Sequence, residues 1–369
     1  MSLPTDPTTR LARIQLARQQ ALAGVDCLDD GLVAPWIAQS WQRCLAQGQR
    51  PDQPVHFNTV TPQTIRDTAE LNQTLVRASR GVLHQLGRAL AQTRYFAILT
   101  NHDGVVIDVD GPIDRQDRRA ELITRIGVDL SERSVGTTAI GAALREQQPV
   151  WLHRGEHFYA QTSVYSCAGA PLIGPDGRCV GMLDLTGIDA MERPELLHLV
   201  NLSARRIENE LVLQRPHRLR LHLNWPGMPL DGESAGIITL DADGQLCAAN
   251  RAARQLLPQL ASPTTSVLHC RDLFALPFEL LFDAAHHPDK LLEAPLWSGL
   301  RMQLRASWGH AQHPAPLSTG ANHLRPLSEM KDALIRQAME AARGNVSQAA
   351  QALGISRATL YRKLRNTHP

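Results

Sequence analysis

The sequence predicts an α+β multidomain fold, because three patterns follow one another along its 369 residues. Short apolar runs separated by turn residues recur from about residue 95 to 186 and again over 236–249, as in antiparallel hairpins. The segments around them repeat apolar residues at helical spacing, and residues 323–369 show helical spacing alone. We therefore expect an antiparallel sheet with flanking helices, a smaller α+β domain and an all-α C-terminal domain.

The composition is that of a globular chain with about two to four domains. Hydrophobic residues make up 43% of the sequence and charged residues 20%, which is ordinary for such proteins. No run of about 18 apolar residues is long enough to span a membrane, and the N-terminus lacks an apolar signal-peptide core. Six scattered cysteines form no CxxC pair, which fits a reducing cytoplasm. We expect a cytoplasmic protein without a cofactor, a metal or a membrane partner.

The first 214 residues divide into a helical segment and a larger domain. Over residues 1–70, two helical stripes precede Gly48 and Pro51, which interrupt the pattern. Over 71–214, helix and strand patterns alternate, and turns rich in Gly and Asp imply antiparallel hairpins. The expected helices cover 71–92, 139–145 and 193–214, and the expected strands cover 95–100, 105–109, 150–153, 168–173 and 179–186.

Residues 215–232 contain three prolines and two glycines and are expected to form a linker. A second α+β domain is expected over 233–310. It begins with a hairpin over 236–249, after which Asn250 is a good N-cap for a short helix. The apolar residues of 296–308 are expected to complete its small sheet. Residues 311–322, rich in Pro, His, Ser and Gly, are expected to be a flexible linker.

The C-terminal 49 residues differ from the rest in charge, with eight Lys and Arg against three Asp and Glu. A basic end on a mildly acidic body is typical of polyanion binding. The pattern predicts a helix over 324–343 that ends at Gly344, a second over 348–353, and a third over 357–365 that Ser356 caps. The last two helices, joined at Gly354, have the spacing of a helix-turn-helix.

The outer face of the last helix carries the candidate DNA-binding residues. The N-terminal end of such a helix meets base edges in double-stranded DNA, and flanking cations meet phosphates. The alternative is an ordinary helical hairpin with a basic, solvated face. The candidates are Ser356, Arg357, Thr359, Tyr361, Arg362 and Lys363.

Polar residues among apolar ones mark a candidate effector site in the larger domain. The candidates are Thr137, Glu156, His157, Phe158, Cys167 and Asp184. A pocket with apolar walls and a few convergent polar groups is typical of small-molecule sites. His153, His157 and Cys167 have no standard metal-ligand spacing, and Cys167 with His157 lacks an evident third group for nucleophilic catalysis. Structural roles are the alternative for all of them; Asp184, for example, is a candidate partner of Thr137.

Residues 344–365, GNVSQAAQALGISRATLYRKLR, resemble the Fis-type helix-turn-helix that also ends the sigma-54-dependent activators. The resemblance implies a homodimer built through the helix 327–343. It also implies that Arg357 reads bases beside Ser356, and that Thr359, Arg362 and Lys363 contact phosphates. Tyr361 departs from the usual pattern, which leaves its role open.

The upstream sequence resembles the family of acetoin-catabolism regulators. The matching segments are SWQRC (40–44), SVGTTAIGAAL (134–144), GEHF (155–158), CAGAPLIGPDGRCVGMLDLTG (167–187) and GIITLDADGQLCAANRAARQLL (236–257). The resemblance implies a GAF-like sensor domain over 71–214 and a PAS-like domain over 233–310. The family's activators also carry an ATPase domain, which needs a phosphate loop of the form GxxxxGK[ST]. None of the three lysines here follows a glycine.

These observations predict a dimeric regulator, not an enzyme, that senses a small-molecule effector and binds operator DNA. RNA polymerase or another regulator is a further expected partner. The alternative is a sensory or scaffold protein that acts mainly through a protein partner, such as a full-length sigma-54 activator.

Overall fold

The computed structural model describes residues 7–22, 31–261, 268–309 and 348. The chain separates into two units, residues 1–311 and 312–369. The first unit contains two sheets. We call the segment that forms the first sheet and its helices the first lobe (7–213), and the segment that forms the second sheet and its helices the second lobe (219–308). The expected linker 311–322 lies outside the described residues, as does the expected helix-turn-helix domain apart from Gln348.

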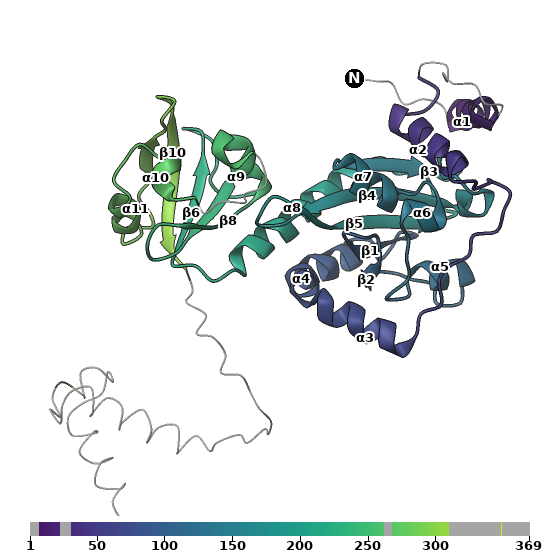
Figure 1. The fold of residues 1–369 in the computed structure, drawn as a ribbon, viewed down its shortest axis with the longest axis horizontal. Helices are drawn as coiled ribbons and strands as arrows, with labels where there is room; N and C mark the ends of the chain where they lie inside the picture. The colour runs from purple at the N-terminus through teal and green to yellow at the C-terminus, as the bar shows by residue number, and fades with distance from the viewer. Residues whose placement is uncertain (1–6, 23–30, 262–267, 310–347, 349–369) are drawn as a thin grey trace, which may run out of the picture. The chain divides into compact units, whose positions relative to one another are not determined.

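The first lobe is built on a five-stranded antiparallel sheet in the order β2-β1-β5-β4-β3 (Figure 1). Its strands are β1 (Tyr95–Asn101), β2 (Val106–Asp110), β3 (Val150–His153), β4 (Tyr165–Ile173) and β5 (Cys179–Ile188). Each expected strand of this domain is therefore present, with ends that differ by a few residues. The antiparallel α+β fold is confirmed.

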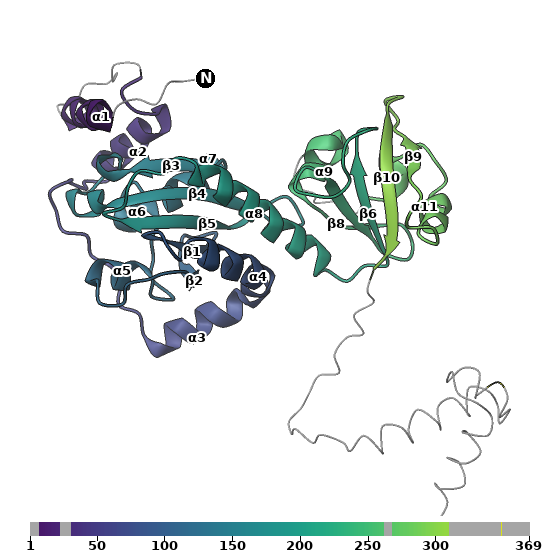
Figure 2. The same ribbon diagram turned by 180° about the vertical axis from the view of Figure 1, so that it is seen from behind.

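Helices cover both faces of this sheet because its strands are apolar on both sides. One face packs against α4 (Gln73–Ala89) and α8 (Leu196–Leu213) through Leu83, Leu86, Val200 and Ile207 (Figure 2). The other face packs against α7 (Ala139–Glu146) and the short helices α5 (Arg118–Ile123) and α6 (Glu132–Val135). Two 3-10 turns, η1 (Arg154–Glu156) and η2 (Ala160–Val164), join β3 to β4.

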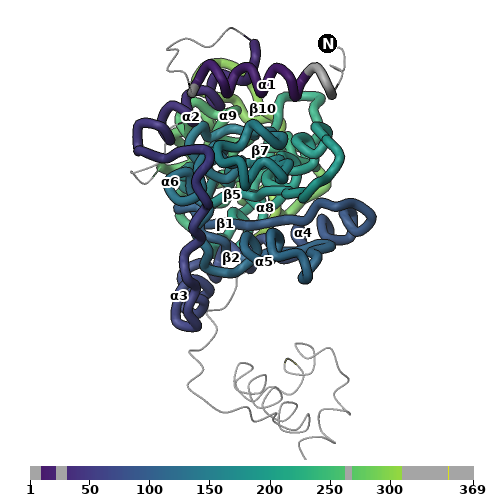
Figure 3. Tube along the Cα trace, turned by 90° about the vertical axis from the view of Figure 1, so that its right-hand side faces the viewer, coloured from purple at the N-terminus to yellow at the C-terminus, as the bar shows by residue number. Residues whose placement is uncertain are grey.

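The N-terminal segment shares the core of the first lobe, so the expected boundary at residue 70 does not separate two cores. Its helices are α1 (Pro7–Leu22), α2 (Pro35–Ala46) and α3 (Pro62–Leu71). Ala17, Ile37 and Trp41 pack with Phe96 and Ile98 of β1 in one cluster. Figure 3 shows α1 and α2 at the opposite end of this lobe from α3.

The second lobe has a five-stranded antiparallel sheet in the order β8-β7-β6-β10-β9. Its strands are β6 (Leu219–Asn224), β7 (Gly236–Leu240), β8 (Leu246–Ala249), β9 (Leu292–Pro295) and β10 (Arg301–Trp308). The remaining elements are α9 (Arg251–Leu256), η3 (Pro258–Leu260), α10 (Cys270–Leu273) and α11 (Glu279–Ala284). The N-cap prediction is confirmed, since the Asn250 side chain accepts a hydrogen bond from the Ala253 amide.

The expected linker over 215–232 is wrong in part, because β6 lies within it as the central strand of the second sheet. Leu219, Leu221 and Leu223 alternate with polar residues, and all three are fully buried. This period of two is a strand signal that the nearby prolines and glycines obscure. Within the described residues, no helix is long and apolar enough to cross a membrane.

Candidate functional site

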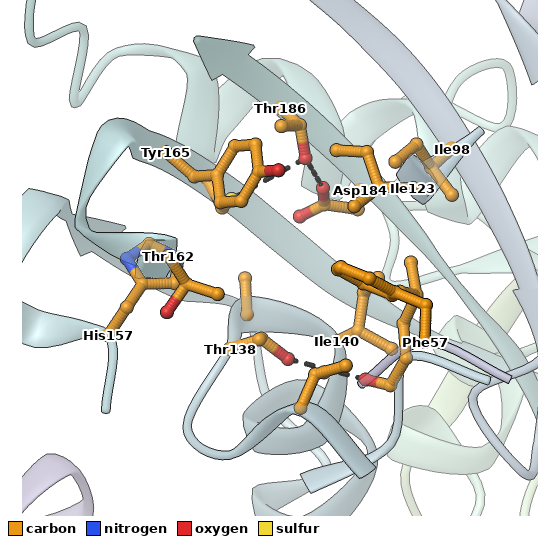
Figure 4. A pocket seen from close by; sticks show the side chains of 14 residues that line it. Phe57, Ile98, Ile123, Thr138, Ile140, His157, Thr162, Tyr165, Asp184 and Thr186 are labelled. Carbon is orange, nitrogen blue, oxygen red and sulfur yellow. Dashed lines mark hydrogen bonds between the residues drawn. The ribbon is translucent and has the colours of Figure 1, made fainter. Parts of the chain in front are cut away.

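A cavity of about 30 Å³ lies in the first lobe, between the sheet and the elements around α7. This is about twice the space that one buried water needs, so only a small molecule fits. Figure 4 shows strand residues on one side of the cavity and Phe57, Thr138 and Ile140 on the other. The lining residues are Phe57, Ile98, Ile123, Leu130, Val135, Thr138, Ala139, Ile140, His157, Thr162, Tyr165, Cys167, Asp184 and Thr186.

The polar lining residues of the sheet reach one face because of the two-residue period of a strand. Asp184 and Thr186 are two apart on β5, and Tyr165 and Cys167 are two apart on β4. Antiparallel register then places Cys167 opposite Thr186. On the other side of β5, Ile98 of β1 is opposite Asp184. The cavity floor is therefore set by strand pairing.

Asp184 is a fully buried carboxyl group on an otherwise apolar stretch of β5. Thr186 donates a hydrogen bond to its Oδ2, while Oδ1 has no partner among the described residues. Burial raises the pKa of the Asp184 carboxyl to about 7, against the smaller effect of the Thr186 hydrogen bond. Burial thus favours the protonated form of this carboxyl group, and its free oxygen can donate as well as accept.

His157 places a second unpaired polar atom at the cavity wall. Its Nδ1 lies 2.9 Å from the carbonyl oxygen of Arg154, which can only accept, so Nδ1 carries the proton. The Nε2 atom is then a bare acceptor, and it is buried without a partner among the described residues. Burial lowers the pKa of His157 to about 4, so the ring is neutral at pH 7.

The N-terminal helices hold the loop that carries His157. Arg18 of α1 donates hydrogen bonds to the carbonyl oxygens of residues 155, 157 and 158, at 2.9, 2.5 and 2.8 Å. Trp41 of α2 donates to the carbonyl oxygen of Glu156 at 3.0 Å. The Glu156 side chain is ion-paired with Arg10 at 2.9 Å and accepts from the His153 amide at 2.6 Å. The wall of the cavity is therefore fastened to a distant part of the sequence.

Of the six effector candidates, the structure brings His157, Cys167 and Asp184 together at the cavity. Glu156 instead braces the loop, and Phe158 packs edge-on against Tyr159. Thr137 lies outside the lining, with its hydroxyl 2.7 Å from that of Ser40.

The expected pairing of Asp184 with Thr137 is wrong, because Thr186, two residues along the same strand, takes that place. Thr186 and Tyr165 are cavity residues that the sequence reasoning missed. Thr186 lies two positions after Asp184 on β5, and Tyr165 lies two positions before Cys167 on β4, so the two-residue period of a strand identifies both.

Cys167 lacks the surroundings of a nucleophile. Its thiol lies 3.4 Å from the Thr186 hydroxyl, and burial, with a smaller contribution from Asp184, holds its pKa well above its usual range. A thiolate is therefore disfavoured. The Nδ1 atom of His153 is hydrogen-bonded to the Ser166 hydroxyl at 2.7 Å. Within the part of the chain that the structure describes, no three His, Cys, Asp or Glu residues gather as a metal site.

The candidate DNA-binding residues, Ser356, Arg357, Thr359, Tyr361, Arg362 and Lys363, lie outside the described residues. Comparison with family models covers this region of the sequence. Residues 327–366 match the model described as "Bacterial regulatory protein, Fis family". A sensor-like α+β lobe upstream of a Fis-type helix-turn-helix defines a class of bacterial transcriptional regulators. Residues 9–209 match the model "MimR, N-terminal domain", and the chain belongs to that family.

Curated relatives include an acetoin catabolism regulatory protein of Cupriavidus necator. It is 30% identical over 259 residues, which are 67% of this chain and 37% of the relative. A propane 2-monooxygenase operon transcriptional activator, MimR, of Mycolicibacterium goodii is 30% identical over 53% of this chain and 33% of its own length. This chain spans about a third of the length of such relatives.

Among solved structures, the E. coli DhaR(N)–DhaL complex aligns with 74% of this chain and 99% of its own. The sequence identity is 16% and the TM-score is 0.46.

Proposed function

We propose that this protein is a ligand-responsive transcriptional regulator whose first lobe binds a small metabolite and whose C-terminal domain binds operator DNA as a homodimer. The observation that carries the sensory part is the cavity, where two buried polar atoms, His157 Nε2 and Asp184 Oδ1, have no hydrogen-bond partner among the residues that the structure describes. Buried polar atoms are normally hydrogen-bonded, and an unsatisfied one costs roughly 1–3 kcal/mol. A ligand that satisfies both atoms recovers this cost and binds selectively.

The cavity favours a small uncharged ligand. Most lining side chains are apolar, and no cationic or anionic side chain other than Asp184 lines it. A charged ligand loses its hydration there without gaining a full set of partners. Because His157 Nε2 can only accept, the ligand must offer at least one hydrogen-bond donor. Cys167 contributes a polarizable, apolar wall in this proposal and no covalent chemistry, and the proposed function is regulatory rather than enzymatic.

The regulatory step requires the ligand to favour one of two conformations of the protein. The loop of His157 supports this part of the proposal. Arg18 of α1 and Trp41 of α2 are hydrogen-bonded to this loop, so a ligand that moves the loop would also move the N-terminal helices. The DNA-binding part rests on the Fis-family match and the basic C-terminal sequence. A cytoplasmic location belongs to the same proposal, because that is where operator DNA would be bound.

A second candidate function is a sensor that acts through a protein partner, such as RNA polymerase or a full-length sigma-54 activator. The Fis-family match and the cavity are compatible with both candidates, and DNA binding with and without a partner separates them.

A cavity-filling substitution tests the sensory site. Small neutral alcohols, with or without a neighbouring carbonyl group, are screened for those that raise the thermal stability of the full chain. Binding to the folded state at a hundredfold excess over Kd adds about 2.7 kcal/mol. The Cys167→Leu variant occupies the cavity and should lose this response. The Cys247→Leu variant, at a half-buried position on β8, is the matched control and should keep it.

A response that survives in Cys167→Leu at full size places the effector site elsewhere. DNA affinity measured on the same samples separates the two candidate functions. Ligand-dependent binding of the chain alone to a promoter fragment supports the regulator. Promoter binding that appears only after a partner protein is added supports the alternative.

A further inference from the structure

The second lobe contains a polar cleft of about 480 Å³ on the open face of its sheet, apart from the cavity of the first lobe. On β6, leucines 219, 221 and 223 point into the core, so Arg220 and His222 point to the opposite face. On β10, Leu304 and Ala306 are buried in the same core, so the residues beside them point outward. The cleft is lined by Arg220, His222, Asp231, Pro288, Asp289, Arg305 and Ser307.

Strand register makes this a compact group. Arg220 is opposite Ser307, and His222 is opposite Arg305, on adjacent strands. Side chains opposite each other on one face of such a pair are about 5 Å apart at their Cβ atoms. Two guanidinium groups, an imidazole and a hydroxyl therefore line one cleft.

The two arginines differ in their partners. Arg305 is ion-paired with Asp231 at 2.8 Å. Arg220 uses its Nε to donate to the Ser307 hydroxyl at 3.1 Å, and no carboxylate of the described residues lies within ion-pair distance of it. Its terminal N–H groups are left as a planar pair of donors, which is the geometry that recognises a carboxylate.

His222, two positions along β6 from Arg220, supplies an acceptor on the same face of the sheet. Its Nδ1 lies 3.0 Å from the carbonyl oxygen of Leu230, so Nδ1 carries the proton and Nε2 is a bare acceptor. The Nε2 atom is buried and has no partner among the described residues. Burial lowers the pKa of His222, and the smaller effects of the Leu230 hydrogen bond and Asp231, which raise it, and of the two arginines, which lower it, leave that direction unchanged. The neutral ring is therefore favoured at pH 7. The Asp289 carboxylate lies at the same cleft.

We propose that this cleft binds a small carboxylic acid that carries a hydrogen-bond donor on the neighbouring carbon, which is an α-amino or α-hydroxy acid. The carboxylate accepts hydrogen bonds from the terminal N–H groups of Arg220, and the adjacent donor is held by His222 Nε2. An ammonium group gains the Asp289 carboxylate as a second partner, whereas a hydroxyl group is satisfied by His222 alone. The protein then has a second sensory site, which is independent of the neutral ligand of the first lobe.

Propionate, L-lactate and L-alanine test the proposal because they share a three-carbon skeleton and differ at the second carbon. Binding of each to the full chain is measured by titration calorimetry. Lactate or alanine should bind about tenfold or more tightly than propionate, which leaves the Nε2 atom unsatisfied. Preference for alanine identifies the amino acid class and a role for Asp289. Preference for lactate identifies the hydroxy acid class.

Three variants and one control test whether binding takes place at this cleft. Arg220→Gln should abolish binding of all three acids, and Arg220→Lys, which keeps the charge but loses the fork, should weaken it. Arg301→Gln, at an exposed position of β10 outside the cleft, is the matched control and should bind as the unmodified protein does. His222→Phe should reduce lactate and alanine to the affinity of propionate while leaving propionate unchanged.

Two outcomes overturn the proposal. One is equal affinity for propionate, lactate and alanine. The other is binding to the unmodified protein that is no stronger than binding to a folded Arg220→Gln or Arg220→Lys variant, with folding checked by circular dichroism.

Discussion

At the scale of single residues, the most informative feature is the conflict between Asp184 and its surroundings. A carboxyl group that is fully buried beside apolar side chains is destabilised in its charged form. Thr186 donates a hydrogen bond to one oxygen, and the other has no partner in the described part of the chain. Such a group lowers the stability of the empty protein, which is a common cost at binding sites.

The raised pKa of Asp184 predicts a specific pH dependence of stability. Its pKa rises from about 3.9 in the unfolded chain to about 7 in the folded protein. The folded state therefore binds the proton more tightly than the unfolded state does. The resulting contribution to the free energy of unfolding is present at low pH and is lost as the pH rises towards 7. Asp184→Asn should remove this loss, which is up to about 4 kcal/mol for a shift of this size.

The measurement is urea unfolding of the unmodified protein and the variant from pH 4 to pH 8. The difference in unfolding free energy should change in favour of the variant as the pH rises. A constant difference across that range contradicts the burial argument for Asp184.

At the scale of elements, the β4–β5 hairpin connects the cavity to the second lobe. One end of these strands carries Cys167 and Asp184, and the turn at the other end meets α9. Arg254 donates to the carbonyl oxygen of Pro175 in that turn at 2.6 Å. Glu208 of α8 accepts from the Ile173 amide at 2.8 Å and from Arg251 at 2.6 Å.

We expect the removal of one partner of the Arg251–Glu208 ion pair to destabilise the protein more than the removal of both. The Glu208 side chain is 1% exposed and the Arg251 side chain 16%, so removal of one partner leaves a buried charge unpaired. Arg251→Met should cost about 3–5 kcal/mol, and adding Glu208→Gln to it should recover much of that loss. Urea unfolding of the single and double variants measures both effects.

The exposed Arg301–Glu293 pair on β9 and β10 is the matched control, since surface pairs contribute only about 0–1 kcal/mol. Equal losses of unfolding free energy at the two pairs would contradict the argument that burial makes the Arg251–Glu208 pair costly to break. No recovery in the double variant would show that Glu208 is held mainly by the Ile173 amide.

At the scale of the whole molecule, the proposed function requires the two lobes and the C-terminal domain to act together. The apolar helical stripe over 327–343, the glycine at 344 and the basic final helix are read from sequence, and the Fis-family match covers all three. A two-fold dimer would present two recognition helices to a palindromic site.

Arg357 and Lys363 should have different effects on DNA binding. Arg357→Ala should weaken binding to the operator by about 1–3 kcal/mol if Arg357 contacts a guanine, with a much smaller loss on random DNA. Lys363→Ala should weaken binding to all sequences and reduce the salt slope by about 1. Fluorescence anisotropy over a range of salt concentrations measures both. Equal losses on operator and random DNA for Arg357→Ala would reduce it to a phosphate contact.

The α+β class and most of the helices and strands followed from periodicity, because a strand or helix buries one face and shows this in local spacing. The Asn250 cap followed from local chemistry in the same way. Local spacing also predicts that Asp184 and Thr186 share a face, but not that Cys167 of the neighbouring strand is opposite Thr186. Likewise, the 215–232 segment contained the alternation of β6, but its place at the centre of a sheet depends on β10, which lies about 80 residues further along the chain.

The sequence by itself determined which residues are apolar, that Asn250 caps a helix and that basic residues gather towards the C-terminus. Tertiary structure alone decided which polar groups remain without partners. His157 Nε2 and His222 Nε2 are bare because a backbone carbonyl takes the other ring nitrogen of each. Thr137 is absent from the cavity because Ser40, nearly a hundred residues earlier, binds its hydroxyl. The physical reason is that burial and hydrogen bonding depend on contacts between distant segments, which spacing along the chain does not specify.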